Sequence, residues 1–455
     1  IMHVFAKAAL LPTGWGKNIG VSIDSKGFIS DVVVDDREKA DVMVDVLLPA
    51  PANLHSHSFQ RAMAGLTEKA NPYKSDSFWS WRKLMYRFLD QLSPEDIESI
   101  AALVQMEMLK SGYCCNVEFH YLHHQAGGIP YSKIHELSSR IIAAADQSGI
   151  GLTLVPVLYQ QGGCDGRNLT KGQIRFGNNL DSFVRLLEGA EKCLKENLPH
   201  DAILGTAAHS LRAVSKENIQ TLQTVSTGPI HMHIAEQPGE VEEVFTNFGA
   251  RPIEWLMNNV EINSRWCLIH CTQMTNNEAI SLAKTGAVAG LCPITESSLG
   301  DGIFNGKIFT GAGGLFGIGS DSNIRISLSE ELRTLEYSQR LRDKSRAILS
   351  DTTKSTGRWI YENVCLGGSK AAARKTGNIS RGFLADLVAI DHSAISLIGR
   401  QEDAIIDSWI FASDDRVVTD VWSAGRHMVK EGIHINERNI ITRYRKTIAR
   451  IEDLL

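Results

Sequence analysis

Residues 44–57 read V-D-V-L-L-P-A-P-A-N-L-H-S-H, an apolar run followed closely by two histidines. Seven comparable apolar runs follow along the chain, and segments with helical periodicity separate each run from the next. Near-continuous apolar strands that alternate with helices are typical of a parallel sheet buried on both faces. Eight such units over about 280 residues predict a (β/α)8 TIM barrel, which typically needs about 250 residues. The eight predicted strands are centred near Leu48, Phe119, Val155, Leu204, His231, Ile269, Gly290 and Ile318.

The two ends of the chain have a different pattern from the middle. Short β-like runs such as V-F-A-K-A-A-L-L near the start and L-A-D-L-V-A-I-D after Gly377 are separated by turn residues. We therefore expect an α/β protein in which residues 1–46 and 378–440 form a small β-sandwich domain. Residues 47–377 would form the barrel, and residues 441–455 a C-terminal helix.

One helix of the predicted barrel has clear start and stop signals. Ser93 is suited to an N-cap, because Pro94 follows in the first turn and the acidic Asp96 stands three residues on. Apolar residues then recur on one face until Gly112, where we expect the helix to end.

Composition excludes several classes of function. The 455 residues carry a formal net charge of -5, so no basic excess exists to neutralise nucleic acid or an anionic membrane. We find no apolar run of about 18 residues, as a membrane span needs, and no signal-peptide pattern in the first residues. The eight cysteines contain no C-x-x-C pair, which favours reduced thiols and a cytoplasmic protein.

Several predicted strands end in a histidine or a carboxylate. Catalytic groups of a TIM barrel lie just past the C-terminal ends of its strands, so we expect these side chains to meet at one mouth. They are His55 and His57 after the first strand, His209 after the fourth, His233 after the fifth, His270 after the sixth and Asp321 after the eighth.

The H-x-H pattern points to a metal. Side chains on an extended segment alternate with period two, so His55 and His57 face the same side. Imidazoles together with one carboxylate are ligands that suit zinc and leave one position for water. Together with His233 and Asp321, the pattern predicts a metal site, although spacing alone allows His231 in place of His233.

Glu236 follows His233 by three residues. A carboxyl group at that place can exchange protons beside a metal-bound water, as a general acid or base must. The alternative is a surface glutamate that stabilises the start of a helix.

Longer motifs resemble those of the formimidoylglutamate deiminases, members of the amidohydrolase superfamily. The most specific are N-L-H-S-H-S-F-Q-R-A-M-A-G-L at residues 53–66, S-F-W-S-W-R-K-L-M-Y-R at 77–87 and E-F-H-Y-L-H-H at 118–124. Further matches are H-S-L-R-A-V at 209–214, H-M-H-I-A-E-Q at 231–237, L-I-H-C-T at 268–272 and G-I-G-S-D-S-N at 317–323. The resemblance therefore covers nearly the whole chain.

The resemblance implies hydrolysis of N-formimidoyl-L-glutamate to N-formyl-L-glutamate and ammonia, in histidine degradation. It implies that His55, His57, His233 and Asp321 bind one zinc ion. Relatives with two metals carry a modified lysine at the end of the fourth strand, where this chain has His209. In the mechanism that we expect, Asp321 takes a proton from water, Glu236 protonates the departing nitrogen and His270 orients or polarises the reacting group.

The glutamate part of such a substrate has two carboxylates, which call for arginines. The substrate contacts expected from the family motifs are Gln60, Arg82, Tyr121, His209 and Arg212.

The family also implies a homodimer. We expect His120, His123 and His124 to be structural, because no matching carboxylates stand beside them. Two alternatives remain: a superfamily deaminase that acts on a ring amine, and an inactive barrel used for binding.

Overall fold

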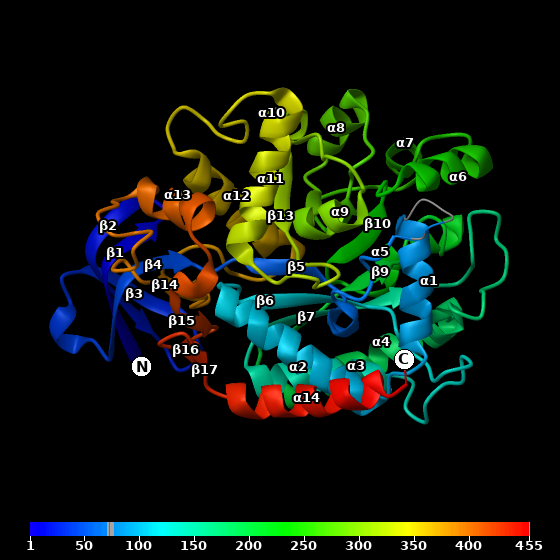
Figure 1. Ribbon diagram of the computed structural model, residues 1–455, viewed down its shortest axis with the longest axis horizontal. Helices are drawn as coiled ribbons and strands as arrows, with labels where there is room; N and C mark the ends of the chain where they lie inside the picture. The colour runs from blue at the N-terminus through cyan, green and yellow to red at the C-terminus, as the bar shows by residue number, and fades with distance from the viewer. Residues whose placement is uncertain (71, 73–76, 455) are drawn as a thin grey trace.

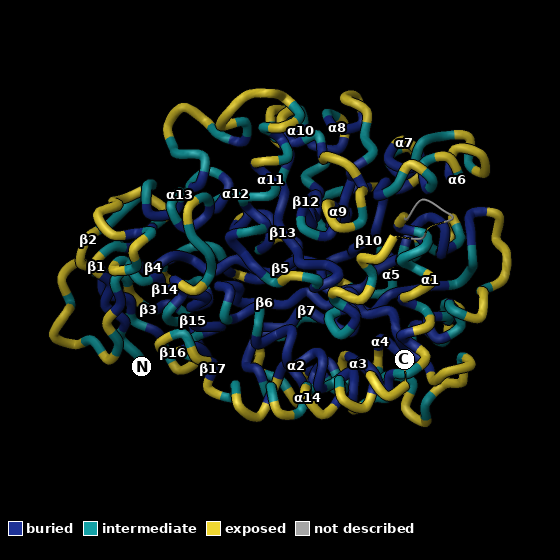
Figure 2. Tube along the Cα trace, in the orientation of Figure 1, coloured by how far each residue is buried: buried dark blue, intermediate teal, exposed yellow. Residues whose placement is uncertain are grey.

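A computed structural model describes residues 1–70, 72 and 77–454, and it contains the predicted (β/α)8 barrel (Figure 1). Its parallel strands pair in chain order, and all are almost completely buried (Figure 2). The strands are β5 (Ala52–Ser56), β6 (Cys115–His120), β7 (Gly151–Leu158), β9 (Thr206–Ala208), β10 (Ile230–Ile234), β11 (Trp266–His270), β12 (Val288–Leu291) and β13 (Leu315–Ile318), with β8 (Ile203–Leu204) beside β7.

The barrel closes between its first and last strands just beyond β13. The amide of Asp321 donates to the carbonyl oxygen of His55 at 2.8 Å, and the amide of His57 donates to the carbonyl oxygen of Asp321 at 3.0 Å. Ser56 and Asp321 form an isolated parallel bridge at the same place. The seam of the barrel therefore runs through residues that were predicted to bind metal.

Helices surround the barrel strands. The predicted start of α2 is confirmed: Ser93 and Asp96 form a reciprocal capping box, Pro94 opens the helix, and Gly112 ends it with a φ of 109°. The helices after the strands are α2 (Pro94–Ser111), α3 (Glu136–Ser148), α4 (Leu180–Asn197), α5 (Lys216–Val225), α6 (Pro238–Phe248), α7 (Pro252–Asn259), α8 (Asn276–Ala283), α9 (Pro293–Leu299), α10 (Gly306–Gly311), α11 (Leu328–Asp343) and α12 (Thr356–Ala371).

A second, mixed sheet is built from both ends of the chain, as expected, and lies to the left of the barrel in Figure 1. Its strands follow the order β17-β16-β15-β14-β4-β1-β2-β3. They are β1 (Met2–Leu11), β2 (Gly14–Ile23), β3 (Ile29–Val34), β4 (Val42–Pro49), β14 (Leu387–Ile390), β15 (Val418–Ser423), β16 (Arg426–Lys430) and β17 (Ile433–His434).

The prediction that the run near Leu48 forms the first barrel strand is wrong. This run is β4, which pairs with β1 and β14 in the terminal sheet, and the barrel begins with β5. Pro49 ends β4 and Pro51 precedes β5, and neither has an amide proton for a sheet hydrogen bond. A continuous apolar run predicts a buried strand, but it does not tell which of two sheets will bury it.

A buried charge network joins the two sheets. Arg374, after α12, contacts Asp201 below the barrel at 2.9 Å and Asp386 beside β14 at 2.8 Å. Arg426 of β16 contacts Asp201 at 2.8 Å. Asp201, Asp386 and Arg374 are each at most 6% exposed, so these contacts are shielded from water.

The last helix, α14 (Glu437–Glu452), runs along α2 (Figure 1). Ion pairs link the two: Lys110 contacts Glu437 at 2.8 Å, and Arg450 pairs with Asp96. Helix α13 (Asp403–Ala412) packs against α12. None of the described helices is long and apolar enough to cross a membrane.

Candidate active site

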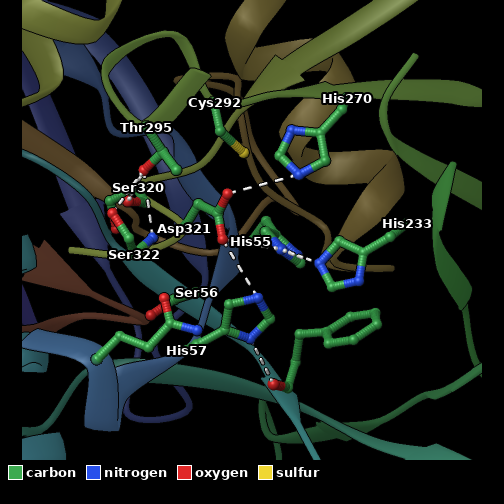
Figure 3. Close-up of polar contacts among 12 residues, drawn as sticks. His55, Ser56, His57, His233, His270, Cys292, Thr295, Ser320, Asp321 and Ser322 are labelled. Carbon is green, nitrogen blue, oxygen red and sulfur yellow. Dashed lines mark hydrogen bonds and ion pairs between the residues drawn. The ribbon is translucent and has the colours of Figure 1, made fainter. Parts of the chain in front are cut away.

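Four side chains converge at the mouth of the barrel (Figure 3). His55 and His57 come from the end of β5, His233 from β10 and Asp321 from the segment after β13. The Nε2 atoms of His55 and His233 lie 3.0 Å apart. Asp321 Oδ1 lies 3.4 Å from Nε2 of His55 and 3.2 Å from Nε2 of His57. Thus the predicted ligands do meet, although strands far apart in the sequence supply them.

These distances fit a single cation. Ligand atoms that bind one tetrahedral zinc at about 2.0–2.1 Å lie roughly 3.3 Å from one another. Each ligand atom of this set lies within 4.8 Å of the others, and the nearest pairs lie 3.0–3.4 Å apart. Three imidazoles and one carboxylate are also a common donor set for zinc.

Outer hydrogen bonds turn two of the imidazoles toward the cluster. His57 Nδ1 lies 3.0 Å from the carbonyl oxygen of Phe119, and His233 Nδ1 lies 3.1 Å from that of His209. A carbonyl can only accept, so Nδ1 carries the proton in both rings and Nε2 presents its lone pair to the cluster. The backbone therefore fixes which nitrogen is free for a metal.

The protonation states also fit a metal. Burial lowers the pKa of His55 to about 3 and so keeps the ring neutral. Burial would raise the pKa of Asp321, but its contacts with the imidazoles of His55 and His57 hold it well below the usual value. A neutral imidazole beside an ionised carboxylate can bind a cation without first releasing a proton.

His270, at the end of β11, lies between carboxylates. Its Nε2 is 3.5 Å from Glu236 Oε1 and 3.5 Å from Asp321 Oδ2, and its Nδ1 is 2.9 Å from Glu296 Oε2. Burial lowers its pKa, but Glu236, Glu296 and Asp321 outweigh burial and raise it to about 10. The predicted catalytic residues Glu236, His270 and Asp321 therefore form one contiguous group.

Sequence reasoning missed Glu296. It stands in the first turn of α9, and its Oε2 also accepts the amide of Cys292 at 2.9 Å. The signal was present, because this carboxylate follows the seventh barrel strand by only a few residues, where catalytic groups collect.

Asp301 was missed as well. Burial and the neighbouring charge of Asp301 raise the pKa of Glu236 well above its usual value. Burial likewise raises the pKa of Asp301 to about 8. Gln237 donates from Nε2 to this carboxylate. A raised pKa favours the protonated carboxyl group, so Glu236 is suited to donate a proton.

A cavity opens above the cluster. The residues expected to contact substrate all line it, together with the catalytic group: Gln60, Arg82, Tyr121, His209, Arg212, Glu236, His270 and Asp321. Gln60 belongs to the 3-10 helix η2 (Ser58–Met63) and donates from Nε2 to the Tyr121 hydroxyl at 3.0 Å. Arg82 comes from α1 (Phe78–Leu89), which also contributes the aromatic side chains of Phe78, Trp81 and Tyr86 to the wall.

The remaining histidines of the motifs lie outside the cluster. His231 Nε2 is 2.8 Å from the carbonyl oxygen of Ala371, so the choice between His231 and His233 falls to His233. His123 and His124 contact the carbonyl oxygens of Val157 at 2.9 Å and Gly177 at 2.7 Å. In the described residues these two imidazoles join no metal-binding group, in agreement with a structural role.

Comparisons with known proteins agree with this geometry. The amidohydrolase family model matches residues 46–428. The chain is 43% identical to the formimidoylglutamate deiminase of Pseudomonas aeruginosa over 99% of both chains, and 24% identical to a 5-methylthioadenosine/S-adenosylhomocysteine deaminase of Bacillus cereus over 94% of this chain and 93% of that one.

Solved structures show the same likeness. A crystal structure of an amidohydrolase from Brucella melitensis superposes with a TM-score of 0.94 at 41% identity, covering 99% of this chain and 100% of that one. A zinc-bound adenosine deaminase from Xanthomonas campestris shares the fold, with a TM-score of 0.83 at 20% identity over 99% and 98% of the two chains. The chain therefore belongs to the amidohydrolase family and is a hydrolase.

Proposed function

We propose that the protein hydrolyses N-formimidoyl-L-glutamate to N-formyl-L-glutamate and ammonia, using one zinc ion, in histidine degradation. The observation that carries the proposal is that Arg82 and Arg212 both line the cavity above the metal-binding cluster. The Pseudomonas aeruginosa relative, which is named for this activity, supports the same substrate.

In the described part of the chain, neither of the two arginines has a carboxylate partner. Among the described residues, neither guanidinium forms an ion pair with a carboxylate, and the buried Arg212 Nε has no hydrogen-bond acceptor. An unpaired buried guanidinium is unfavourable, so it is suited to a charge that arrives with the ligand. A substrate with two carboxylates satisfies both arginines.

His55, His57, His233 and Asp321 would hold the zinc ion. When bound, zinc supplies a water molecule that is acidic enough to attack near neutral pH. The absence of a lysine where His209 ends the fourth strand supports one metal per chain.

The protein groups then move the protons. Asp321 takes a proton as the water oxygen bonds to the amidine carbon. Glu236, whose pKa burial raises, donates a proton to the terminal nitrogen, and the bond from the carbon to that nitrogen breaks to release ammonia. The remaining proton of the attacking water passes from the new hydroxyl group to the Glu236 carboxylate, which leaves the carbon as the formyl carbonyl. His270 contacts both carboxylates through Nε2 and so orients the reacting group between them.

A ring-amine deaminase is the second candidate. The aromatic walls of the cavity, which include Trp81, Tyr121 and Phe176, favour it, as a purine would stack on them. Two arginines in the same cavity that pair with no carboxylate of the described residues favour the dicarboxylate instead. An inactive barrel has no support in the geometry, because the four predicted ligands and Glu236 all come together.

The test is product analysis with zinc-loaded protein and N-formimidoyl-L-glutamate. We expect ammonia and N-formylglutamate in equal amounts. Formamide and glutamate would show cleavage of the other carbon–nitrogen bond, and turnover of adenosine-type amines alone would reassign the substrate. We propose a cytoplasmic location from the pattern of cysteines and a homodimer from the family resemblance; sedimentation of the purified protein tests the dimer.

A further inference from the structure

Trp79 connects the two arginines of the cavity. The guanidinium carbon of Arg82 lies 5.3 Å from the centre of the Trp79 ring, and that of Arg212 lies 5.3 Å from the same ring. Arg82 belongs to α1, whereas Arg212 follows strand β9 of the barrel. One indole therefore contacts cations from two separate parts of the fold.

The ring also limits the spacing of the two charges. Because both guanidinium carbons lie at the same distance from one ring, they can be no farther apart than twice that distance. Trp79 is not one of the side chains that line the cavity, so it acts on a ligand only through the arginines.

Two further contacts hold the Trp79 ring and the Arg82 guanidinium in place. A Cβ placed on Gly239 of α6 would lie 3.2 Å from Trp79 Nε1, so the indole sits close against this glycine, which leaves room for it. Arg82 donates from Nε to the Tyr86 hydroxyl at 2.5 Å, and its guanidinium also lies over the Tyr86 ring. Arg212 Nε has no such partner, so its orientation depends more on the indole.

We infer that Trp79 is a positioning residue that sets the distance between the two guanidinium groups and thereby selects dicarboxylate over monocarboxylate ligands. The inference rests on the proposed function for the identity of the substrate. Cation–π contacts orient a guanidinium over a ring face, and two contacts on one ring couple the positions of the two cations.

The test compares substrates that differ by one carboxylate: N-formimidoyl-L-glutamate and N-formimidoyl-4-aminobutyrate. In the zinc-loaded wild type we expect the second carboxylate to raise kcat/KM by about 100-fold, and in Trp79→Ala by only about 10-fold. Trp79→Phe should restore most of the preference. Leu84→Ala, on the exposed side of the same helix, is the matched control and should leave the ratio unchanged.

Binding of glutarate and butyrate, measured by calorimetry, separates this inference from the proposed function. The measured quantity is the ratio of the dissociation constants of butyrate and glutarate. We expect this ratio to be about 10-fold smaller in Trp79→Ala than in the wild type. If the wild type prefers glutarate but does not release ammonia, the proposed function fails and the inference stands. The inference is overturned if Trp79→Ala binds glutarate and butyrate more weakly by the same factor, or if its preference for glutarate equals that of the wild type.

Discussion

Nδ1 of His270 lies 2.9 Å from Oε2 of Glu296, and this carboxylate oxygen also accepts the amide of Cys292. The backbone of α9 thus holds the carboxylate, and the carboxylate holds the imidazole. Because Nδ1 donates to Glu296, Nε2 is directed at Glu236 and Asp321. Glu296, which belongs neither to the cluster of His55, His57, His233 and Asp321 nor to the cavity wall, therefore sets the direction of the His270 ring.

Glu296→Gln should lower kcat about 10-fold while zinc content stays the same, since outer-shell partners of catalytic groups contribute on this scale. Burial lowers the pKa of His270, but Glu236, Glu296 and Asp321 raise it to about 10. Activity that needs the imidazolium is present below that pH and lost as the pH rises through it. Loss of the Glu296 charge should move this alkaline limb to lower pH. An unchanged pH profile of kcat would contradict the role of Glu296.

Glu236→Gln should retain one zinc per chain and lose about 1000-fold in kcat, because an amide cannot deliver the proton to the departing nitrogen. The measurements are ammonia release and metal analysis of the same sample. Glu243→Gln is the matched control; this residue lies on α6, which begins two residues after Glu236, and accepts the amide of Cys164 at 2.9 Å. Activity of Glu236→Gln close to that of the control would rule out proton transfer by Glu236.

His233→Ala and His231→Ala form a second matched pair. Both imidazoles are buried on β10, but only Nε2 of His233 reaches the cluster, 3.0 Å from His55 Nε2. His231 Nε2 contacts the carbonyl of Ala371 instead. After dialysis against a chelator and addition of zinc, His231→Ala should regain one zinc per chain, whereas His233→Ala should bind at least 10-fold more weakly. The assignment of ligands fails if the two variants bind zinc alike.

Arg212→Met should raise KM for N-formimidoyl-L-glutamate about 100-fold, since a charge-assisted, two-pronged contact with a carboxylate is lost. Methionine keeps the apolar stem and so preserves packing. Arg185→Met, an exposed arginine on α4, should leave KM unchanged. If both variants show wild-type KM, Arg212 does not bind the substrate.

Asp201 makes stability depend on pH. Burial would raise the pKa of this carboxyl, but Arg426 and Arg374 hold it well below the usual value. A depressed pKa in the folded state adds stability above the unfolded pKa of about 3.9, and this stability is lost as the pH falls below it. Asp201→Asn should therefore cost about 3 kcal/mol of unfolding free energy at pH 7. Urea unfolding at pH 7 and pH 3 checks this; an equal difference at both values would contradict the ion network.

The sequence predicted the barrel, its strand ends and the metal-binding residues because those signals are local. His55, His57 and His233 each end an apolar run, and the fold rule places such ends at one mouth. The α2 helix was predictable for the same reason, as Ser93 and Gly112 mark its ends within one segment.

Contacts between distant segments could not be predicted in the same way. The apolar run near Leu48 is compatible with either sheet, and its pairing with β1 and with β14, the latter more than 300 residues later, places it in the terminal sheet. Glu296 and Asp301 carry no local mark of their function, because burial beside His270 and Glu236 creates it. The two arginines on one indole are likewise a product of packing.

The metal-binding cluster lies where the first barrel strand, β5, meets the segment after the last one, β13. The cluster can therefore form only after the last barrel strand has been synthesised. Asp321 hydrogen-bonds to His55 and His57 through its backbone and approaches them through its side chain, so it completes both the barrel and the ligand set. A nascent chain that ends before residue 315 has three imidazoles but neither the carboxylate nor the closing strand. The complete ligand set is therefore available only late in synthesis, and a cation bound there would link the two ends of the barrel sheet.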